Sequence, residues 1–296
     1  MPRPFTREQI VKRLRKVVAE GGVIFGAGSS NGIIAKCAEI GGADLIITYS
    51  TGKSRAMGLP TMRIGWSNPL TVGMYHEVAN VVQDTPIIGG AEANDLTNMS
   101  LERILKVFTE RAGWSDGWDF GFDGIINFPT VGFNQTRGSA ARKRMHASKM
   151  LRGWNREVEM IRIAHEMNIF TMCYAFSAED AEEMAQAGCD LIVAHVGGTT
   201  GGLTGIPGRN IDEACNVANE ILDGARDVDP DILCVVHGGP FDIPENTKYI
   251  YERTIGQGFV GASSIERIPV ENAVINEAKN FKHFTLKPEN RYKGKK

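Results

Sequence analysis

Eight short apolar runs recur along the chain, and their number and spacing constrain the fold more than any other feature. Each run is rich in β-branched residues and ends in glycine or polar residues. They cover residues 23–27, 45–49, 87–91, 124–128, 169–175, 191–196, 232–237 and 258–262. Apolar residues are continuous within each run rather than alternating with polar ones, which is typical of strands buried on both faces of a parallel sheet.

Helical patterns separate these runs. Apolar residues repeat at helical intervals in residues 31–40, 101–108, 156–167, 178–187, 212–225, 246–255 and 270–281. Eight strand–helix units in fewer than 300 residues predict an α/β fold of the (β/α)8 TIM-barrel type. The alternative is a doubly wound open sheet, which more often has five to seven strands.

An additional helix is expected before the first strand. Thr6 and Gln9 have the spacing of a capping box, and apolar residues repeat at helical intervals up to residue 19. We therefore expect a TIM barrel with an extra N-terminal helix within residues 1–20, in one domain spanning 1–296. Residues 287–296 are polar and charged, and we expect them to form a frayed tail.

The units differ in length. The second (residues 50–72) and the fourth (residues 129–155) are long enough to predict extended loops after their strands. In a barrel such loops cover the carboxyl ends of the strands, where active sites are built.

Charge and composition exclude several classes of protein. There are 33 Lys and Arg residues against 35 Asp and Glu, so a nucleic-acid partner is not expected. No apolar run approaches 18 residues and the first residues lack an apolar signal core, so neither a membrane partner nor secretion is expected. The five cysteines are scattered and are predicted to be reduced and buried, as in a cytoplasmic protein; they are Cys37, Cys173, Cys189, Cys215 and Cys234.

The chain has 34 glycines, and many of them follow predicted strands. Glycine-rich turns expose backbone N–H groups that favour an anion. The first such turn superficially resembles a dinucleotide fingerprint, but its third glycine is misplaced, and a tight turn alone also explains it. Turns after strands seven and eight form the phosphate pocket of many barrels. The candidate anion-binding residues are Gly28, Ser29, Lys53, Asn127, Gly238, Gly239, Gly261, Ser263 and Ser264.

Four titratable residues at strand ends are the candidate catalytic residues. His195 and His237 end strands six and seven, and could be a general acid and base, two metal ligands, or hydrogen-bonded core histidines. Glu92 and Asp95 follow strand three and could act as a base, although Asp95 could instead cap a helix. Glu92, Asp95 and His195 are also the candidate ligands for a divalent metal, Mg²⁺ or Zn²⁺.

Aromatic residues crowd the segment before strand four: Trp114, Trp118, Phe120 and Phe122. At the amino-terminal side of a barrel, such a cluster predicts a subunit contact and therefore a homo-oligomer.

Several of these segments occur together in one order. They include Gly26-Ala27-Gly28, Asn127-Phe128-Pro129-Thr130, Thr199-Thr200-Gly201-Gly202, His237-Gly238-Gly239-Pro240 and Gly261-Ala262-Ser263-Ser264. Over residues 5–285 the chain resembles the phosphoenolpyruvate hydrolase-like family of barrels, also described as indole-glycerol-phosphate-synthase-like. It is similar as well to the C-terminal barrel of the plant tobamovirus-resistance protein. The resemblance implies hydrolysis of a three-carbon oxoacid like phosphonopyruvate or phosphoenolpyruvate. Where the family usually has Thr-Asp-Pro after strand three, this chain has Asn94-Asp95-Leu96, so only Asp95 carries over.

Two hypotheses of function follow. The first is a hydrolase or lyase acting next to a carbonyl in a small anionic oxoacid. In it, Gly239, Ser263 and Ser264 hold the anion, His195 or a divalent cation polarises the carbonyl, and Glu92 or Asp95 is the base. The alternative is a ligand-binding or signalling barrel that binds a phosphorylated small molecule without turnover.

Overall fold

The computed structural model describes residues 4–95, 97, 99–110, 121–133, 153–292 and 294. Its centre is a closed barrel of eight parallel strands in sequence order. The strands are β1 (Ile24–Gly28), β2 (Leu45–Thr48), β3 (Ile87–Ala91), β4 (Gly124–Asn127), β5 (Phe170–Ala175), β6 (Leu191–His195), β7 (Leu233–His237) and β8 (Gly258–Gly261). β1 pairs with β8 in the register Gly26↔Val260, which closes the ring. The predicted (β/α)8 barrel is confirmed, and the open sheet is excluded.

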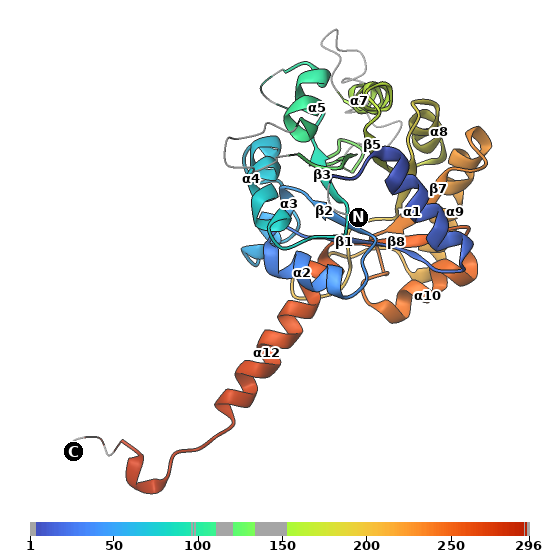
Figure 1. Cartoon of the computed structure of the whole chain (residues 1–296). Helices are drawn as coiled ribbons and strands as arrows, with labels where there is room; N and C mark the ends of the chain where they lie inside the picture. Colours follow the sequence, from blue (N-terminus) through green and yellow to red (C-terminus); the bar gives the residue numbers. More distant parts are fainter. Residues whose placement is uncertain are drawn as a thin grey trace.

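Helices surround the barrel (Figure 1). They are α2 (Gly32–Ile40), α3 (Thr51–Ala56), α4 (Ser67–Ala79), α5 (Leu101–Thr109), α7 (Trp154–Glu166), α8 (Ala178–Gln186), α9 (Ile211–Val228), α10 (Pro244–Arg253), α11 (Ser263–Glu266) and α12 (Ile268–Lys282), with a 3₁₀ turn η1 (Pro288–Asn290) near the end. Apolar side chains form two layers, one inside the barrel and one between the strands and the helices. No helix within the described ranges is long and apolar enough to cross a membrane.

The extra N-terminal helix is α1 (Arg7–Ala19), and its capping box of Thr6 and Gln9 is present. Ile10 and Leu14 are fully buried and belong to the same apolar cluster as Ile24 at the start of β1. The backbone N–H of Phe5 donates to Oδ1 of Asp123, just before β4, at 3.0 Å. The helix therefore packs at the amino-terminal end of the barrel, which leaves the opposite end for a ligand.

Two expectations from the sequence were wrong. The second unit is not a continuous loop, because residues 50–72 contain α3 and the start of α4. The cysteines are not all reduced and buried: Cys173 and Cys189, on and beside neighbouring strands β5 and β6, form a disulfide, and Cys37 is exposed.

The subunit contact predicted for the aromatic segment stays a prediction, because the structure describes only Phe122 of its four residues. Phe122 is buried and its ring stacks on Phe108 with centroids 5.5 Å apart, so it belongs to the core and not to an exposed contact. Trp114, Trp118 and Phe120 lie outside the described residues.

Candidate active site

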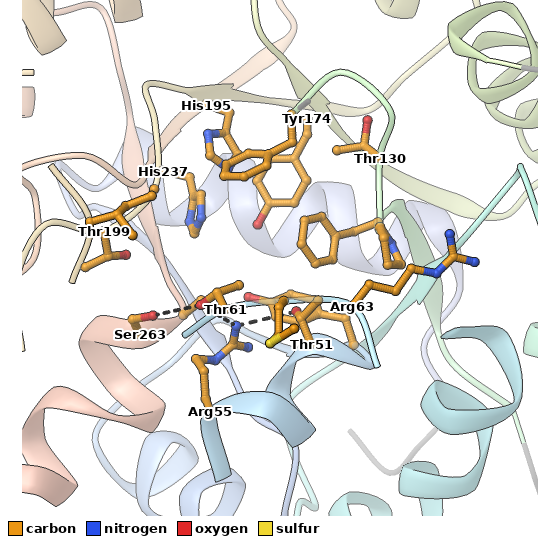
Figure 2. Close-up of a pocket in the computed structure, with 18 of the residues that line it drawn as sticks. Thr51, Arg55, Thr61, Arg63, Thr130, Tyr174, His195, Thr199, His237 and Ser263 are labelled. Atoms are coloured by element: carbon orange, nitrogen blue, oxygen red, sulfur yellow. Dashed lines mark hydrogen bonds between the residues drawn. The ribbon is translucent and has the colours of Figure 1, made fainter. Parts of the chain in front are cut away.

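A cavity of about 500 Å³ opens at the carboxyl ends of the strands. Figure 2 shows His195, His237 and Tyr174 on one side of it and Arg55, Thr61 and Ser263 on the other. The position agrees with the general rule that barrel active sites lie at this end.

The floor of the cavity is aromatic. Tyr49 follows β2, Phe128 follows β4, and Tyr174 is near the end of β5. The ring of Phe128 lies 5.0 Å from that of Tyr49 and 5.5 Å from that of Tyr174, measured between centroids. Burial raises the pKa of both tyrosines above the usual value, so both hydroxyls stay neutral.

His195 and His237 lie side by side against this floor. They are paired residues in the β6–β7 register, and their ring centroids are 4.7 Å apart. Phe176 stacks on His195 at 4.8 Å, and Tyr174 contacts both imidazoles. Neighbouring parallel strands that end in histidine thus place two rings at the same height in the barrel.

The two neutral imidazoles are held in opposite tautomers. The backbone N–H of Gly197 donates to Nδ1 of His195 at 3.2 Å, so the proton of this neutral ring is on Nε2. In His237, Nδ1 lies 2.7 Å from the carbonyl oxygen of Val260, which can only accept, so Nδ1 carries the proton and Nε2 carries the lone pair. One ring therefore offers a donor and the other an acceptor.

Both rings are neutral near pH 7. Burial lowers the pKa of His195 well below its usual value, and the neighbouring His237 adds to this effect. Burial also lowers the pKa of His237 to about 4, although the Val260 carbonyl opposes the shift.

A carboxylate and a guanidinium form one wall of the cavity. Glu92 is buried, and both of its oxygens lie 2.8 Å from guanidinium nitrogens of Arg63, which is partly exposed. Oδ1 of Asn68 accepts a hydrogen bond from the Glu92 backbone at 2.8 Å. Burial raises the pKa of Glu92 to about 7, while the positive charge of Arg63 opposes that shift. The carboxyl group can therefore exchange a proton near neutral pH.

A buried ion pair supports the opposite wall. Nε of Arg55 on α3 donates to Oε2 of Glu266 on α11 at 2.6 Å, and both side chains are almost fully buried. Arg55 also contacts Thr61 at 3.4 Å, and Thr61 in turn lies 3.4 Å from Oγ of Ser263. This chain of contacts joins the loop after β2 to the start of α11 (Figure 2).

Four cavity-lining side chains carry buried polar atoms without a hydrogen-bond partner among the described residues. They are Oη of Tyr49, Oγ1 of Thr204, Nε of Arg267 and Nη2 of Arg55, the last of which forms an ion pair with Glu266. Because native proteins rarely leave such atoms unpaired, they suit a polar ligand.

The loop after β4 is fixed by a buried glutamate. Glu157 on α7 accepts hydrogen bonds from Asn127 Nδ2 at 2.8 Å, from Thr130 Oγ1 at 2.7 Å and from the Val131 backbone at 2.8 Å. Asn127 is thus a buried contact of Glu157, and it is Thr130 and Val131 that line the cavity.

The predicted catalytic residues are only partly brought together. Glu92, His195 and His237 line the cavity. Asp95 does not line it, and its Oδ1 accepts a hydrogen bond from the backbone of Thr97 at 2.7 Å.

Of the nine predicted anion-binding residues, only Ser263 lines the cavity. Lys53 lies 3.6 Å from Glu77 on α4, and Oγ of Ser29 donates to the Asn31 carbonyl. Gly28 and Gly261 lie within strands, Gly238 and Gly239 form a turn with positive φ angles, and Ser264 lies on α11.

The donor set does not fit a magnesium site. Mg²⁺ needs oxygen ligands with free lone pairs, usually from one or two carboxylates. Within the described ranges, both Glu92 oxygens lie against Arg63, Oδ1 of Asp95 accepts from Thr97, and each histidine has one ring nitrogen with no hydrogen-bond partner. In the part of the chain that the structure describes, no three His, Cys, Asp or Glu residues cluster as metal ligands.

Together these features define a class: a (β/α)8 barrel whose cavity combines a neutral histidine pair, an aromatic floor and walls built on arginine–glutamate ion pairs. The chain belongs to the phosphoenolpyruvate hydrolase-like family, whose profile matches residues 9–284.

Known proteins similar to this chain agree with that assignment. The ToMV resistance protein Tm-1(GCR237) of Solanum lycopersicum is 35% identical over 286 residues, which is 95% of this chain but 36% of the tomato protein. The chain thus spans about a third of that relative's length.

Two solved structures show the same fold at low sequence identity. Phosphonopyruvate hydrolase in complex with oxalate and Mg²⁺ has a TM-score of 0.55 at 14% identity, over 93% of this chain and 87% of that one. 2,3-Dimethylmalate lyase, a member of the PEP mutase/isocitrate lyase superfamily, has a TM-score of 0.58 at 13% identity, over 98% and 91%.

Proposed function

We propose that the protein is a hydrolase or lyase that cleaves a bond next to the carbonyl of a small anionic oxoacid. The histidine pair is the observation that carries this proposal. Buried neutral imidazoles with one Nε2–H donor and one Nε2 lone pair supply an acid and a base within a single cavity. Membership of the phosphoenolpyruvate hydrolase-like family and the fold of oxoacid-cleaving enzymes support the same substrate class.

Each histidine has a separate role in the proposed reaction. Nε2–H of His195 donates to the carbonyl oxygen of the substrate, and Nε2 of His237 takes a proton from water or from a substrate hydroxyl. If water gives up the proton, the hydroxide bonds to the departing group, such as the phosphoryl group of phosphonopyruvate; if a substrate hydroxyl gives it up, that oxygen becomes the carbonyl of the departing fragment. The electron pair of the broken bond stays on the carbon beside the substrate carbonyl as an enolate, whose oxygen is stabilised by the His195 donor. The proton that His237 took then goes to the enolate carbon and completes the product.

The charged end of the substrate has its own partners. Ser263, Thr61 and the partly exposed guanidinium of Arg63 line the cavity opposite the histidines. Hydroxyl groups and a guanidinium are suited to a carboxylate, phosphonate or phosphate. In this proposal the base is His237 rather than Glu92, because the Glu92 carboxylate is already bound by Arg63.

The test is a turnover screen of phosphonopyruvate, phosphoenolpyruvate and other short oxoacids, with and without added Mg²⁺ or Zn²⁺. We expect His237→Asn to lower kcat by about 10²-fold or more, the range of general acid–base catalysis. The matched control is His283→Asn, because His283 is exposed just after α12. Turnover by the wild type that His237→Asn leaves unchanged would contradict the proposal.

A ligand-binding barrel without turnover is the second candidate. It is favoured by the donor set, which lacks the carboxylate cluster of a magnesium site among the described residues. Calorimetry separates the two functions: a phosphorylated oxoacid that binds the wild type with no product formed, even with added metal, supports this candidate.

A further inference from the structure

Part of the cavity has no role in the proposed reaction, which uses the two histidines and the polar side chains of Ser263, Thr61 and Arg63. The cavity lined by the described residues measures about 500 Å³, within the range of roughly 300–1,000 Å³ that holds drug-sized ligands. A three-carbon oxoacid is much smaller than such a ligand. It would therefore leave room in the cavity for further atoms of the substrate.

Large apolar side chains from three loops line the cavity and remain exposed. Met62 lies between α3 and α4, Phe133 follows β4, and Ile206 follows β6. Their exposed fractions are 47%, 40% and 42%. Single exposed apolar residues are ordinary on a protein surface, but several around one cavity indicate that an apolar group binds there.

Two of these side chains lie beside the proposed carbonyl donor. The ring of Phe133 contacts that of His195, with the centroids 5.2 Å apart. A Cβ atom built on Gly198 would lie 2.3 Å from Cδ1 of Ile206 and 3.7 Å from Cζ of Phe133, so both side chains approach the same glycine. Phe133 and Ile206 therefore form one apolar wall next to His195.

Backbone contacts position both side chains of the apolar wall. A Cβ atom on Gly132 would lie 2.5 Å from the ring of Phe176, so the backbone just before Phe133 packs closely on that ring. The backbone N–H of Ile206 donates to the carbonyl of Thr199 at 3.2 Å. A wall that is fixed before the ligand arrives costs less entropy on binding, which favours a ligand of matching shape.

An aromatic ring is the group that suits this position best. The floor of the cavity consists of the rings of Tyr49, Phe128 and Tyr174, and the ring of Tyr174 also contacts that of His195, with centroids 5.2 Å apart. Aromatic rings attract one another in edge-to-face and offset arrangements, so a ligand ring gains more among these side chains than an alkyl group of similar size does.

We propose that the oxoacid substrate carries an aryl group, and that Phe133 and Ile206 form the subsite that binds it. This assignment rests on the proposed function, which supplies the oxoacid, and adds the substituent that determines specificity. With the substrate carbonyl on Nε2 of His195, the aryl group meets the apolar wall and the anionic end lies toward Ser263. Phosphonopyruvate and other short oxoacids lack the aryl group, and we expect them to bind weakly.

Calorimetry with pyruvate and phenylpyruvate tests the subsite, because the two differ by one phenyl ring and binding is measured without turnover. We expect the wild type to bind phenylpyruvate about 10²-fold more tightly, within the range for burying a phenylalanine-sized group. Phe133→Ala and Ile206→Ala should each reduce that preference by about tenfold. The matched control is Leu203→Ala, because Leu203 is in the same loop as Ile206, is 74% exposed and is not among the side chains that line the cavity.

Both truncated side chains are partly exposed, so the variants keep the core of the barrel intact. A wild type that binds phenylpyruvate no more tightly than pyruvate, or that binds neither, would overturn the subsite. So would a preference for phenylpyruvate that Phe133→Ala and Ile206→Ala leave unchanged.

The oxoacid with the leucine side chain separates an aryl subsite from a general apolar one. We expect the wild type to bind it about fivefold less tightly than phenylpyruvate, and Phe133→Leu to remove that difference. Equal or tighter binding of the leucine oxoacid by the wild type would overturn the choice of an aryl group.

Failure of the subsite and failure of the proposed function give different results. A preference for phenylpyruvate without cleavage of any oxoacid would support the subsite and contradict the reaction. Cleavage of short oxoacids by a wild type that shows no such preference would support the reaction and contradict the subsite.

Discussion

Glu92 and Arg63 show how one contact sets the charge of a cavity wall. Burial alone would hold the Glu92 carboxyl in its neutral form, and the guanidinium of Arg63 is the opposing charge that keeps its pKa as low as about 7. We therefore expect Arg63→Gln to raise the pKa of Glu92 further, by about one unit, since nearby opposite charges shift carboxyl groups by 1–3 units.

Carbon-13 NMR titration of the Glu92 carboxyl measures this change. Arg162→Gln is the control, because Arg162 is paired with Glu159 and Glu166 on α7 rather than with a cavity residue. If both substitutions leave the Glu92 titration at the same midpoint, the guanidinium does not set the charge of this wall.

At the level of single residues, the sequence predicted the histidines but not the residues around them. His195 and His237 stand out because a polar residue ends an apolar run. Tyr49 and Tyr174 instead continue such runs, so they were not distinguished from core residues. Successive side chains of a strand point to opposite faces of the sheet. This alternation would have put both tyrosines and both histidines inside the barrel. Tyr174, for example, is two residues after the inward-facing Met172. Arg63 was missed because it lies in a segment taken for a loop.

Helices α3 and α11 are joined at the element scale by the buried pair of Arg55 and Glu266. Glu266→Ala would leave a buried guanidinium without its counter-charge, and we expect it to lower the free energy of unfolding by about 3 kcal/mol. Urea denaturation measures the loss. Glu159→Ala, which breaks an exposed pair on α7, should cost less than about 1 kcal/mol.

A double variant separates the effect of the buried charges on stability from the effect of side-chain packing. Arg55→Met with Glu266→Leu replaces both charges by apolar groups of similar size, and should recover most of the stability that Glu266→Ala loses. Equal losses for Glu266→Ala and Glu159→Ala would show that the buried pair holds the two helices no better than a surface contact does.

Helices with one apolar face were predicted to within a few residues, whereas α3 and α4 in the second unit were missed. Helices α5 and α9 have that pattern. Helix α4 has Pro69 in its first turn and Gly73 in its middle, and its buried residues mix Ser, Asn and Thr with apolar ones. The existence of α12 was predicted, but its projection from the barrel was not, because an apolar stripe does not indicate which surface covers it.

For the molecule as a whole, the number and continuity of the apolar runs were enough to predict a closed barrel. Contacts that form only when the strands pair in the closed barrel could not be predicted from the sequence. The Cys173–Cys189 disulfide joins residues 16 apart that become neighbours only when β5 and β6 pair. The long second and fourth units likewise gave no indication of which side chains reach the cavity.

The neutral histidine pair makes the stability of the whole molecule depend on pH. The pKa of His237 is about 4 in the folded protein, against an ordinary value of 6.5. Between these values the unfolded chain binds the proton and the folded protein does not, so the free energy of unfolding falls as the pH falls through this window. Above pH 6.5 the contribution of this histidine is complete.

Urea denaturation at pH 7 and pH 5 tests this coupling. By linkage, His237 alone should account for about 2 kcal/mol of the loss between these two pH values. We expect His237→Asn to lose correspondingly less stability on acidification than the wild type does, because the variant has no imidazole to protonate at that position. His283→Asn, at an exposed position, should follow the wild type. Identical pH dependence in all three proteins would mean that His237 is protonated as easily when folded as when unfolded, and that it is not held as a neutral base.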